Sequence, residues 1–164
     1  RSSSSWTTRC WPGSSKPSGK FAPVRAIVIY ESLTGNTRTA GEAIAQRLSA
    51  SGVATKACPI TAIDYQALAD ADLVIVGSWV DGVFVVGQRP GRVGRIKAMP
   101  AIQGKKAAVY LTYALNPGKA LQKLSDTVAA QGAEVLGGVT IRRDKIVEGV
   151  DDFVDRLLDA VAPA

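Results

Sequence analysis

The 164-residue sequence predicts an α/β fold, a doubly wound three-layer sandwich in which a five-stranded parallel sheet lies between two layers of helices. Its length and its 46% share of hydrophobic residues fit one domain with a sizeable core. Five short segments are apolar enough to be strands buried on both faces, and helical patterns alternate with them. This alternation of strand and helix is typical of a parallel sheet with crossover connections.

Three strands and two helices are predicted in the first half of the domain. The first strand is apolar except for Arg25, as expected of a strand covered on both faces. The first helix follows because apolar residues recur four positions apart, and the second begins at an aspartate that can cap it. The predicted elements are strand 24–30, helix 37–49 with Ala40, Ile44 and Leu48 on one face, edge strand 53–60 closed by Pro59, a short helix from Asp64, and strand 72–78.

Two further strands and two helices are predicted after a long connection rich in Gly and Arg. Pro117 suits the first turn of a helix, where its missing N–H costs nothing. The last helix has apolar residues at 3.6-residue spacing. These elements are strand 105–113, a helix from Pro117 with the stripe Leu121, Leu124 and Val128, strand 133–141, and helix 146–161.

Sheets of this kind bind ligands beyond the carboxyl ends of their strands, where the strand order reverses. We expect the strand order 2-1-3-4-5. Function is therefore expected in the loops that follow strands 1, 3 and 4. We call them the first loop (31–37), the second loop (78–92) and the third loop (112–118).

The formal charge of +6 does not by itself indicate a nucleic-acid-binding protein. Residues 1–23 contain four basic residues and no acid, so they carry +4 of this charge. The other 141 residues hold 16 Lys or Arg and 14 Asp or Glu, which leaves +2. Because the excess lies mostly outside the predicted domain, no nucleic-acid partner is expected.

The segment 1–23 is rich in Ser, Gly and Pro and has no periodicity, so we expect a disordered or non-native tail ahead of a domain at 24–164. It lacks the apolar core of a secretory signal, and its Arg and Ser content leaves a transit peptide as an alternative. No apolar run approaches the roughly 20 residues of a membrane span. A cytoplasmic monomer without a membrane span is the expectation.

Cysteine and histidine content excludes several kinds of site. Cys10 lies in the tail and Cys58 in a predicted strand, so neither a disulfide framework nor a metal site is expected. The chain has no histidine, which rules out Ser-His-Asp and Cys-His catalysis and zinc sites that need histidine.

The first loop combines hydroxyl groups, an amide side chain and Gly35 directly before a helix. The free N–H groups and the dipole of a helix N-terminus favour an anion. No lysine follows as in nucleoside-triphosphate loops, and the glycine pattern of dinucleotide folds is absent. The composition favours a phosphate monoester, although the same residues could merely form a turn and a helix cap.

The stretch "VIYESLTGNTRTAGEAIAQRL" (28–48) resembles the FMN-phosphate signature of the flavodoxins, in which an aromatic residue precedes a Ser/Thr-x-Thr-Gly-x-Thr loop and a helix. The resemblance extends over about 24–162 and implies a flavodoxin-like fold with FMN as cofactor. The family usually has Ala where this chain has Gly41.

The second and third loops also resemble those of flavodoxins. A Trp at the position of Trp79 stacks on the flavin ring in short-chain members, although a rim tryptophan remains the alternative. The third loop is shorter than usual and lacks a carboxylate, so Tyr113 could cover the ring or belong to the core. No residue is expected to be catalytic and no metal is expected. The resemblance implies cofactor contacts from Ser32, Leu33, Thr34, Gly35, Asn36, Thr37, Ser78, Trp79, Val80, Asp81, Gly82, Thr112, Tyr113, Ala114, Leu115, Asn116 and Gly118.

The connection "GQRPGRVGRIK" (87–97), which overlaps the end of the second loop, is basic, in contrast to typical acidic flavodoxins. Arg89, Arg92 and Arg95 could form a solvated face or a docking patch for an acidic redox partner. One charge about 10 Å from the flavin, at an effective dielectric constant near 20, contributes about 1.7 kcal/mol or roughly 70 mV. We therefore expect a less negative flavin potential than in acidic flavodoxins.

Two main functional interpretations remain open, of which the favoured one is an electron carrier that cycles one or two electrons on FMN. The alternative is an FMN-dependent oxidoreductase that acts directly on a quinone or another small substrate, with NAD(P)H as a reductant. A third possibility, a receiver domain, needs paired acids after strand 1 and an Asp after strand 3. The chain has Glu31 and Gly77-Ser78 there, so this interpretation fails.

Overall fold

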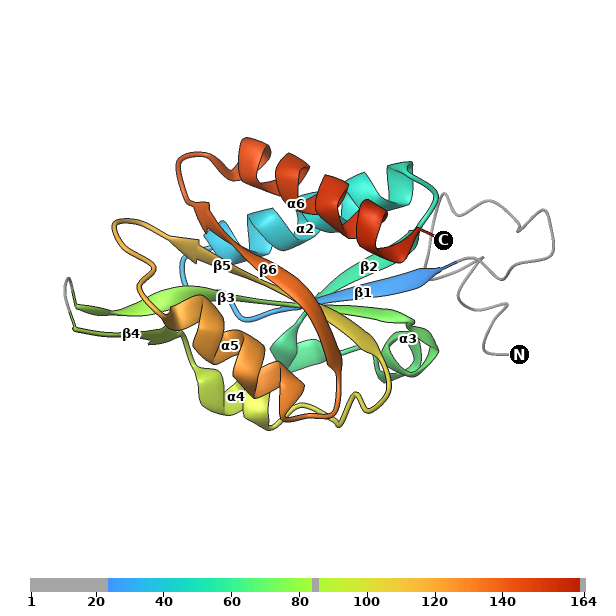
Figure 1. Cartoon of the computed structure of the whole chain (residues 1–164), viewed down its shortest axis with the longest axis horizontal. Coiled ribbons are helices and arrows are strands. Elements are labelled where there is room, and N and C mark those ends of the chain that lie inside the picture. The colour runs from blue at the N-terminus through green and yellow to red at the C-terminus, as the bar shows by residue number, and fades with distance from the viewer. Residues whose placement is uncertain (1–23, 84–85, 163–164) are drawn as a thin grey trace.

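The computed structural model describes residues 24–83 and 86–162, so the predicted tail at 1–23 lies outside the described residues. Five parallel strands form the main sheet in the order β2-β1-β3-β5-β6 (Figure 1). This order confirms the expected 2-1-3-4-5 arrangement, counted over the parallel strands. The strands are β1 (Arg25–Tyr30), β2 (Ala54–Pro59), β3 (Leu73–Val83), β4 (Val86–Pro90), β5 (Lys106–Tyr113) and β6 (Glu134–Arg142).

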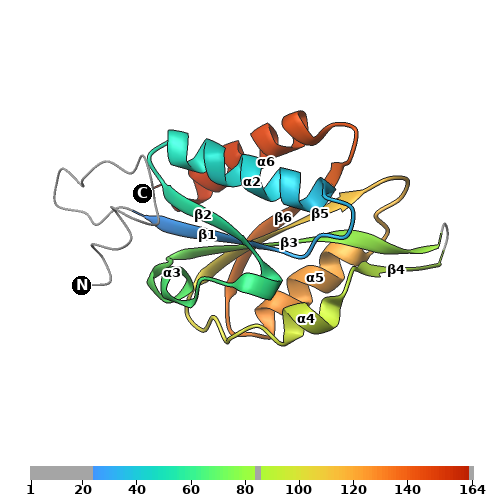
Figure 2. The same ribbon diagram turned by 180° about the vertical axis from the view of Figure 1, so that it is seen from behind.

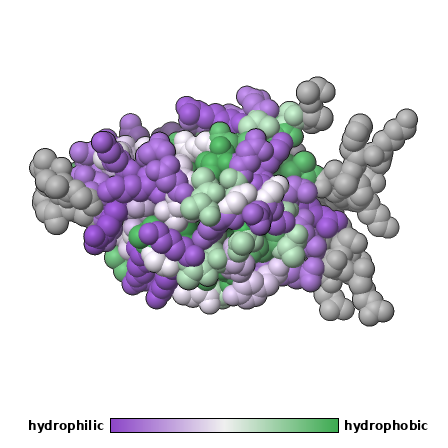
Figure 3. Space-filling view, turned by 60° about the horizontal axis from the view of Figure 1, so that its bottom comes forward, coloured by the Kyte–Doolittle hydropathy of each residue, from purple (hydrophilic) through white to green (hydrophobic). Residues whose placement is uncertain are grey.

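Helices cover both faces of the sheet (Figure 2). On one face lie α2 (Asn36–Ala50) and α6 (Ile146–Val161), which pack against each other. On the other face lie α3 (Tyr65–Asp70), α4 (Val93–Lys97) and α5 (Ala120–Ala129). A short 3-10 turn, η2 (Ile60–Ala62), follows β2. On the side that α4 and α5 form, hydrophilic side chains surround smaller apolar areas (Figure 3). No helix in the described part of the chain is long and apolar enough to cross a membrane.

The second loop differs from the expected irregular connection. β3 continues to Val83, and β4 returns beside it in antiparallel pairing, with Asp81 opposite Arg89. α4 then follows at once. The run of β-branched residues along this segment explains the hairpin, because valine favours extended backbone. Its Gly and Arg residues had indicated a loop.

Helix starts agree with the prediction to within a few residues. Asp64 caps α3, since its side chain accepts a hydrogen bond from the Ala67 N–H at 2.9 Å. α5 begins at Ala120 rather than at Pro117, whose carbonyl accepts the Ala120 N–H at 3.1 Å. The proline therefore forms the turn that leads into the helix.

Tyr110 connects the sheet to the start of α2. Its ring is fully buried, and its hydroxyl donates to the Thr37 carbonyl oxygen at 2.8 Å. Two glycines make room for it. A Cβ on Gly77 would lie 2.0 Å from the ring, and a Cβ on Gly41 would lie 2.5 Å from the hydroxyl oxygen. The glycine that departs from the flavodoxin signature is thus required by this tyrosine, which fixes α2 and the first loop against β5.

Candidate functional site

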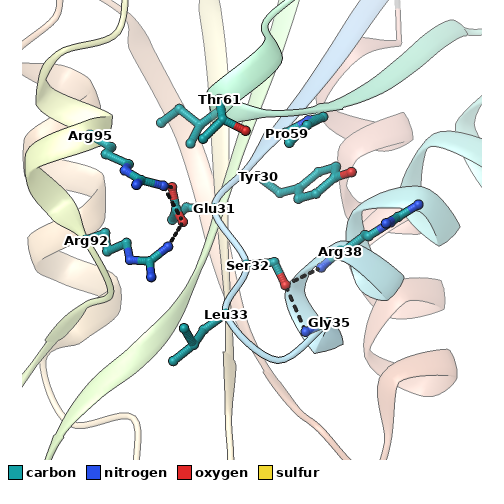
Figure 4. A pocket seen from close by; sticks show the side chains of 11 residues that line it. Tyr30, Glu31, Ser32, Leu33, Gly35, Arg38, Pro59, Thr61, Arg92 and Arg95 are labelled. Carbon is teal, nitrogen blue, oxygen red and sulfur yellow. Dashed lines mark hydrogen bonds and ion pairs between the residues drawn. The ribbon is translucent and has the colours of Figure 1, made fainter.

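The first loop is closed by its own serine. Ser32 Oγ accepts hydrogen bonds from the N–H groups of Gly35 at 3.2 Å and Arg38 at 3.3 Å (Figure 4). Gly35 has a φ of +99°, a conformation that favours glycine. The loop therefore curves tightly into the N-terminus of α2.

Several donors of this loop remain available to a ligand. Among the described residues, no hydrogen-bond partner occurs for the N–H groups of Leu33, Thr34, Asn36 and Thr37. These groups lie at the positive end of the α2 dipole, so they form a concave site for an anion. The Thr34 hydroxyl accepts from the Asn36 side chain at 3.3 Å and still has its hydrogen to donate.

The first and third loops are joined by a buried pair of hydroxyl groups. Thr37 Oγ1 and Thr112 Oγ1 lie 2.8 Å apart, and both side chains are buried. Beyond Thr112 the chain turns outward. The Asn116 side chain accepts the Gly118 N–H at 2.9 Å, and Leu115 is 73% exposed.

All three loops border one cleft of about 170 Å³ at the carboxyl ends of β1, β3 and β5. Eight of its nine lining residues were predicted to contact the cofactor, and the ninth, Arg143, was missed. Arg143 follows β6, whose loop had not been considered. Its N–H donates to the Tyr113 carbonyl at 2.9 Å, which brings it beside the third loop. The cleft is lined by Leu33, Thr34, Asn36, Trp79, Val80, Thr112, Tyr113, Ala114 and Arg143.

The other predicted contacts are absent from the lining of the cleft in the described part of the chain. Ser78 is buried and donates its hydroxyl hydrogen to the Gly91 carbonyl at 2.8 Å. Asp81 pairs with Arg89 at 3.5 Å in the β3–β4 hairpin. The remaining ones are Ser32, Gly35, Thr37, Gly82, Leu115, Asn116 and Gly118. Their contacts with a cofactor stay predictions.

Trp79 borders the cleft with its indole fixed against the chain that follows β4. A Cβ on Gly91 would lie 2.1 Å from the indole, so only glycine permits this packing. The Arg92 guanidinium carbon lies 5.7 Å from the centroid of the indole ring, within the range of a cation–π contact.

Glu31 is a buried acid at the end of β1, with only 3% of its surface exposed. Arg92 donates to one of its oxygens at 2.9 Å, and Arg95 donates to both at 3.3 and 3.2 Å (Figure 4). Arg92, at the end of the second loop, and Arg95, in α4, thus neutralise a buried carboxylate. This ion pairing could not be predicted from the sequence, because Glu31 directly follows an apolar strand and its partners are distant in the chain.

The fold and the cleft define a mononucleotide-binding α/β protein with an anion-binding loop before its first crossover helix. The chain belongs to the flavodoxin family, since the flavodoxin domain model matches residues 27–160. No curated protein sequence matches it significantly.

Solved flavodoxin structures share the fold at low sequence identity. Two-electron reduced flavodoxin of Megasphaera elsdenii is 17% identical with a TM-score of 0.68, over 82% of this chain and 98% of that one. An archaeal flavodoxin is 20% identical with a TM-score of 0.63, over 85% and 100%. Flavodoxin 1 of Bacillus cereus is 19% identical with a TM-score of 0.63, over 84% and 99%.

Membership of this family makes FMN the cofactor and electron transfer the general function. The residues of the site fit this cofactor. The first loop offers unpaired N–H donors suited to a phosphate, and no carboxylate lines the cleft in the described part of the chain. Trp79 and Tyr113 supply aromatic surface suited to a flavin ring.

Proposed function

We propose that this flavodoxin is an electron carrier that passes one or two electrons between partner proteins. One observation carries the proposal: among the residues that the structure describes, the lining of the cleft holds hydroxyl, amide, aromatic and guanidinium groups but no carboxylate, thiol or imidazole. Bound FMN supplies the redox chemistry, and the protein needs only to bind it, orient it and set its electrostatic surroundings.

We propose that each of the three loops contacts a different part of FMN. The first loop holds the phosphate through the free N–H groups of Leu33, Thr34, Asn36 and Thr37 and the hydroxyls of Ser32, Thr34 and Thr37. Trp79 and Tyr113 flank the ring, and the backbone of 112–116 lies along its edge. The family resemblance supports the same role for Asp81 and Gly82.

Reconstitution of the full chain with FMN tests this assignment. We expect the visible absorbance of the flavin to co-elute with the protein in gel filtration, and Thr34→Val to weaken FMN binding. A matched control is Thr127→Val, whose hydroxyl donates to the Lys123 carbonyl within α5 and does not line the cleft. Equal affinity in both variants would contradict the phosphate assignment.

The oxidoreductase alternative is separated by turnover without a partner protein. A carrier oxidises NAD(P)H with a quinone only when a reductase is added. Sustained turnover by the FMN-loaded protein alone would make it an enzyme.

We further propose that an acidic redox partner docks near Arg89, Arg92 and Arg95. Their side chains are 64%, 44% and 49% exposed, and Arg92 lies beside Trp79. Because Asp81 and Glu31 neutralise part of this charge, the patch carries about +1 and its steering effect should be modest. An association rate that does not fall with added salt would rule it out.

The domain is proposed to comprise 24–164, to act as a monomer and to reside in the cytoplasm. A variant lacking residues 1–23 should retain the free energy of unfolding and the FMN affinity of the full chain. Light scattering of both proteins gives the oligomeric state, and fractionation of the source cells gives the compartment.

A further inference from the structure

A second cavity, which we call the side cavity, opens on the β2 side of the first loop. Its volume is about 400 Å³, larger than the cleft. Its walls come from the end of β1, the residues after β2, the first turn of α2 and the α4 segment (Figure 4). Of the residues that line the cleft it shares only Leu33. A ligand in the cleft therefore meets the side cavity only along the first loop, where Ser32, Leu33 and Gly35 line it.

The polar side chains around the side cavity are predominantly hydrogen-bond donors. Arg92 and Arg95 contact Glu31 through Nη1 alone. Their other guanidinium nitrogens have no hydrogen-bond partner among the described residues. Thr61 adds a hydroxyl. Such a lining is suited to an acceptor-rich group.

Charge favours the same kind of ligand. Arg38, Arg92 and Arg95 line the side cavity, and Glu31 is the only acid in its lining over residues 24–83 and 86–162. The lining carries a formal +2, and Glu42, which pairs with Arg38 at 2.8 Å, lowers the charge of the group to +1. Because Glu31 is buried and forms ion pairs with both Arg92 and Arg95, it holds their guanidinium groups in place before any ligand binds. Planar guanidinium groups fixed in this way recognise phosphate and carboxylate.

The rest of the wall is apolar. Tyr30 and Pro59 lie across the side cavity from Arg92 and Arg95 (Figure 4), and Ile60 also lines it. Its volume lies within the usual range of small-molecule sites. We propose that the side cavity binds a small organic anion, with a phosphate or carboxylate group on the arginines and an apolar part against Tyr30 and Ile60. This site is independent of the flavin chemistry proposed above.

Titration of the full chain, saturated with FMN, tests the proposal. The probes are phenyl phosphate, benzoate and uncharged benzamide, followed in ¹⁵N–¹H spectra. One of the two anions should shift the amide signals of Ser32, Thr61 and Arg95 with a dissociation constant of about 1 mM or less. The tighter anion distinguishes phosphate from carboxylate. Flavin absorbance in the same sample reports FMN occupancy, so a failure of flavin binding is seen separately.

Variants distinguish specific binding in the side cavity from nonspecific attraction of the anion to positive surface charge. Arg38→Gln and Thr61→Val leave the Glu31 pairs intact, and Arg38→Gln should weaken the anion about tenfold. Arg95→Gln combined with Glu31→Gln should also weaken it without leaving a buried charge unpaired. Arg89→Gln removes an equal charge outside the side cavity and is the matched control, with less than about a twofold effect expected.

Three results would overturn the proposal. One is the absence of saturable shifts with either anion, and another is equal binding of benzamide. The third is equal weakening by Arg38→Gln and Arg89→Gln, which would reduce the effect to surface charge. Saturable binding of a glutamate-rich peptide in place of both small anions would instead assign this surface to a protein partner.

Discussion

The contact between Gly41 and Tyr110 gives a quantitative test of how the first loop is held. In Gly41→Ala, the new Cβ would lie 2.5 Å from the Tyr110 hydroxyl oxygen, whereas ordinary contacts begin near 3.4 Å. Tyr110 is fully buried and has no space to withdraw. Overpacking of this kind costs about 1–3 kcal/mol. Alanine regains up to about 1 kcal/mol through its higher helix propensity.

Tyr110→Phe removes the same oxygen by another route. It should cost about 1 kcal/mol, because the hydrogen bond to the Thr37 carbonyl is lost. In the double variant no oxygen remains for the new methyl group to strike. Its nearest neighbour is then Tyr30 Cδ2 at 3.2 Å. The double variant should therefore be more stable than the sum of the single effects by about 1–3 kcal/mol.

Urea unfolding of the four FMN-free proteins measures this coupling energy, since bound cofactor would add its own stabilisation. The matched control is Tyr30→Phe, which keeps Tyr30 Cδ2 and removes a hydroxyl that Gly41 does not approach. Its combination with Gly41→Ala should be additive. Additivity within about 0.5 kcal/mol in the Tyr110 cycle would refute the close contact.

Three further predictions concern charged groups. Replacing both arginines that contact Glu31 by glutamine should lower the free energy of unfolding by about 3–5 kcal/mol, because a buried carboxylate loses its partners. Adding Glu31→Gln should restore most of this stability. Failure of the added substitution to restore stability would contradict the pairing. The Lys56 ammonium and then the Ala67 N–H lower the pKa of Asp64. The resulting stabilisation is present above the unfolded pKa of about 3.9 and is lost as pH falls through the folded pKa. In parallel acid titrations followed by circular dichroism, wild-type stability should therefore drop more steeply below about pH 4 than that of Asp64→Asn. Arg143→Gln should lower the FMN midpoint potential, measured by potentiometric titration, by several tens of millivolts.

Regular periodicity made the sheet predictable from the sequence. Each parallel strand is a short apolar run, and each long helix carries an apolar stripe, so hydrophobic pattern alone gives their order. The β3–β4 hairpin was not recognised because Gly and Arg interrupt its valines. Its pairing depends on contacts between strands, such as Asp81 opposite Arg89, which single-sequence patterns do not show.

Some residues of the candidate site could be predicted from the sequence and others could not. First-loop residues form a contiguous motif, so Thr34 and Asn36 could be placed near the cofactor from the sequence. Arg143 could have been found by asking which loops share the sheet edge with the third loop, since β6 lies directly beside β5. Glu31 could not, because its partners Arg92 and Arg95 are about 60 residues away in the chain.

Because of these ion pairs, we expect Arg143, rather than Arg89, Arg92 and Arg95, to be the main positive charge near the flavin. Arg89, Arg92 and Arg95 each have a carboxylate partner, which offsets much of their field at the cleft. Arg143 lines the cleft, and no ion pair to it occurs within the described residues, while its neighbour Arg142 is held by Asp144 at 3.0 and 2.6 Å. Arg142→Gln removes the same formal charge from a paired position outside the cleft lining. If net charge alone set the potential, both variants would shift it equally; a larger shift in Arg143→Gln would assign the effect to this unpaired cation.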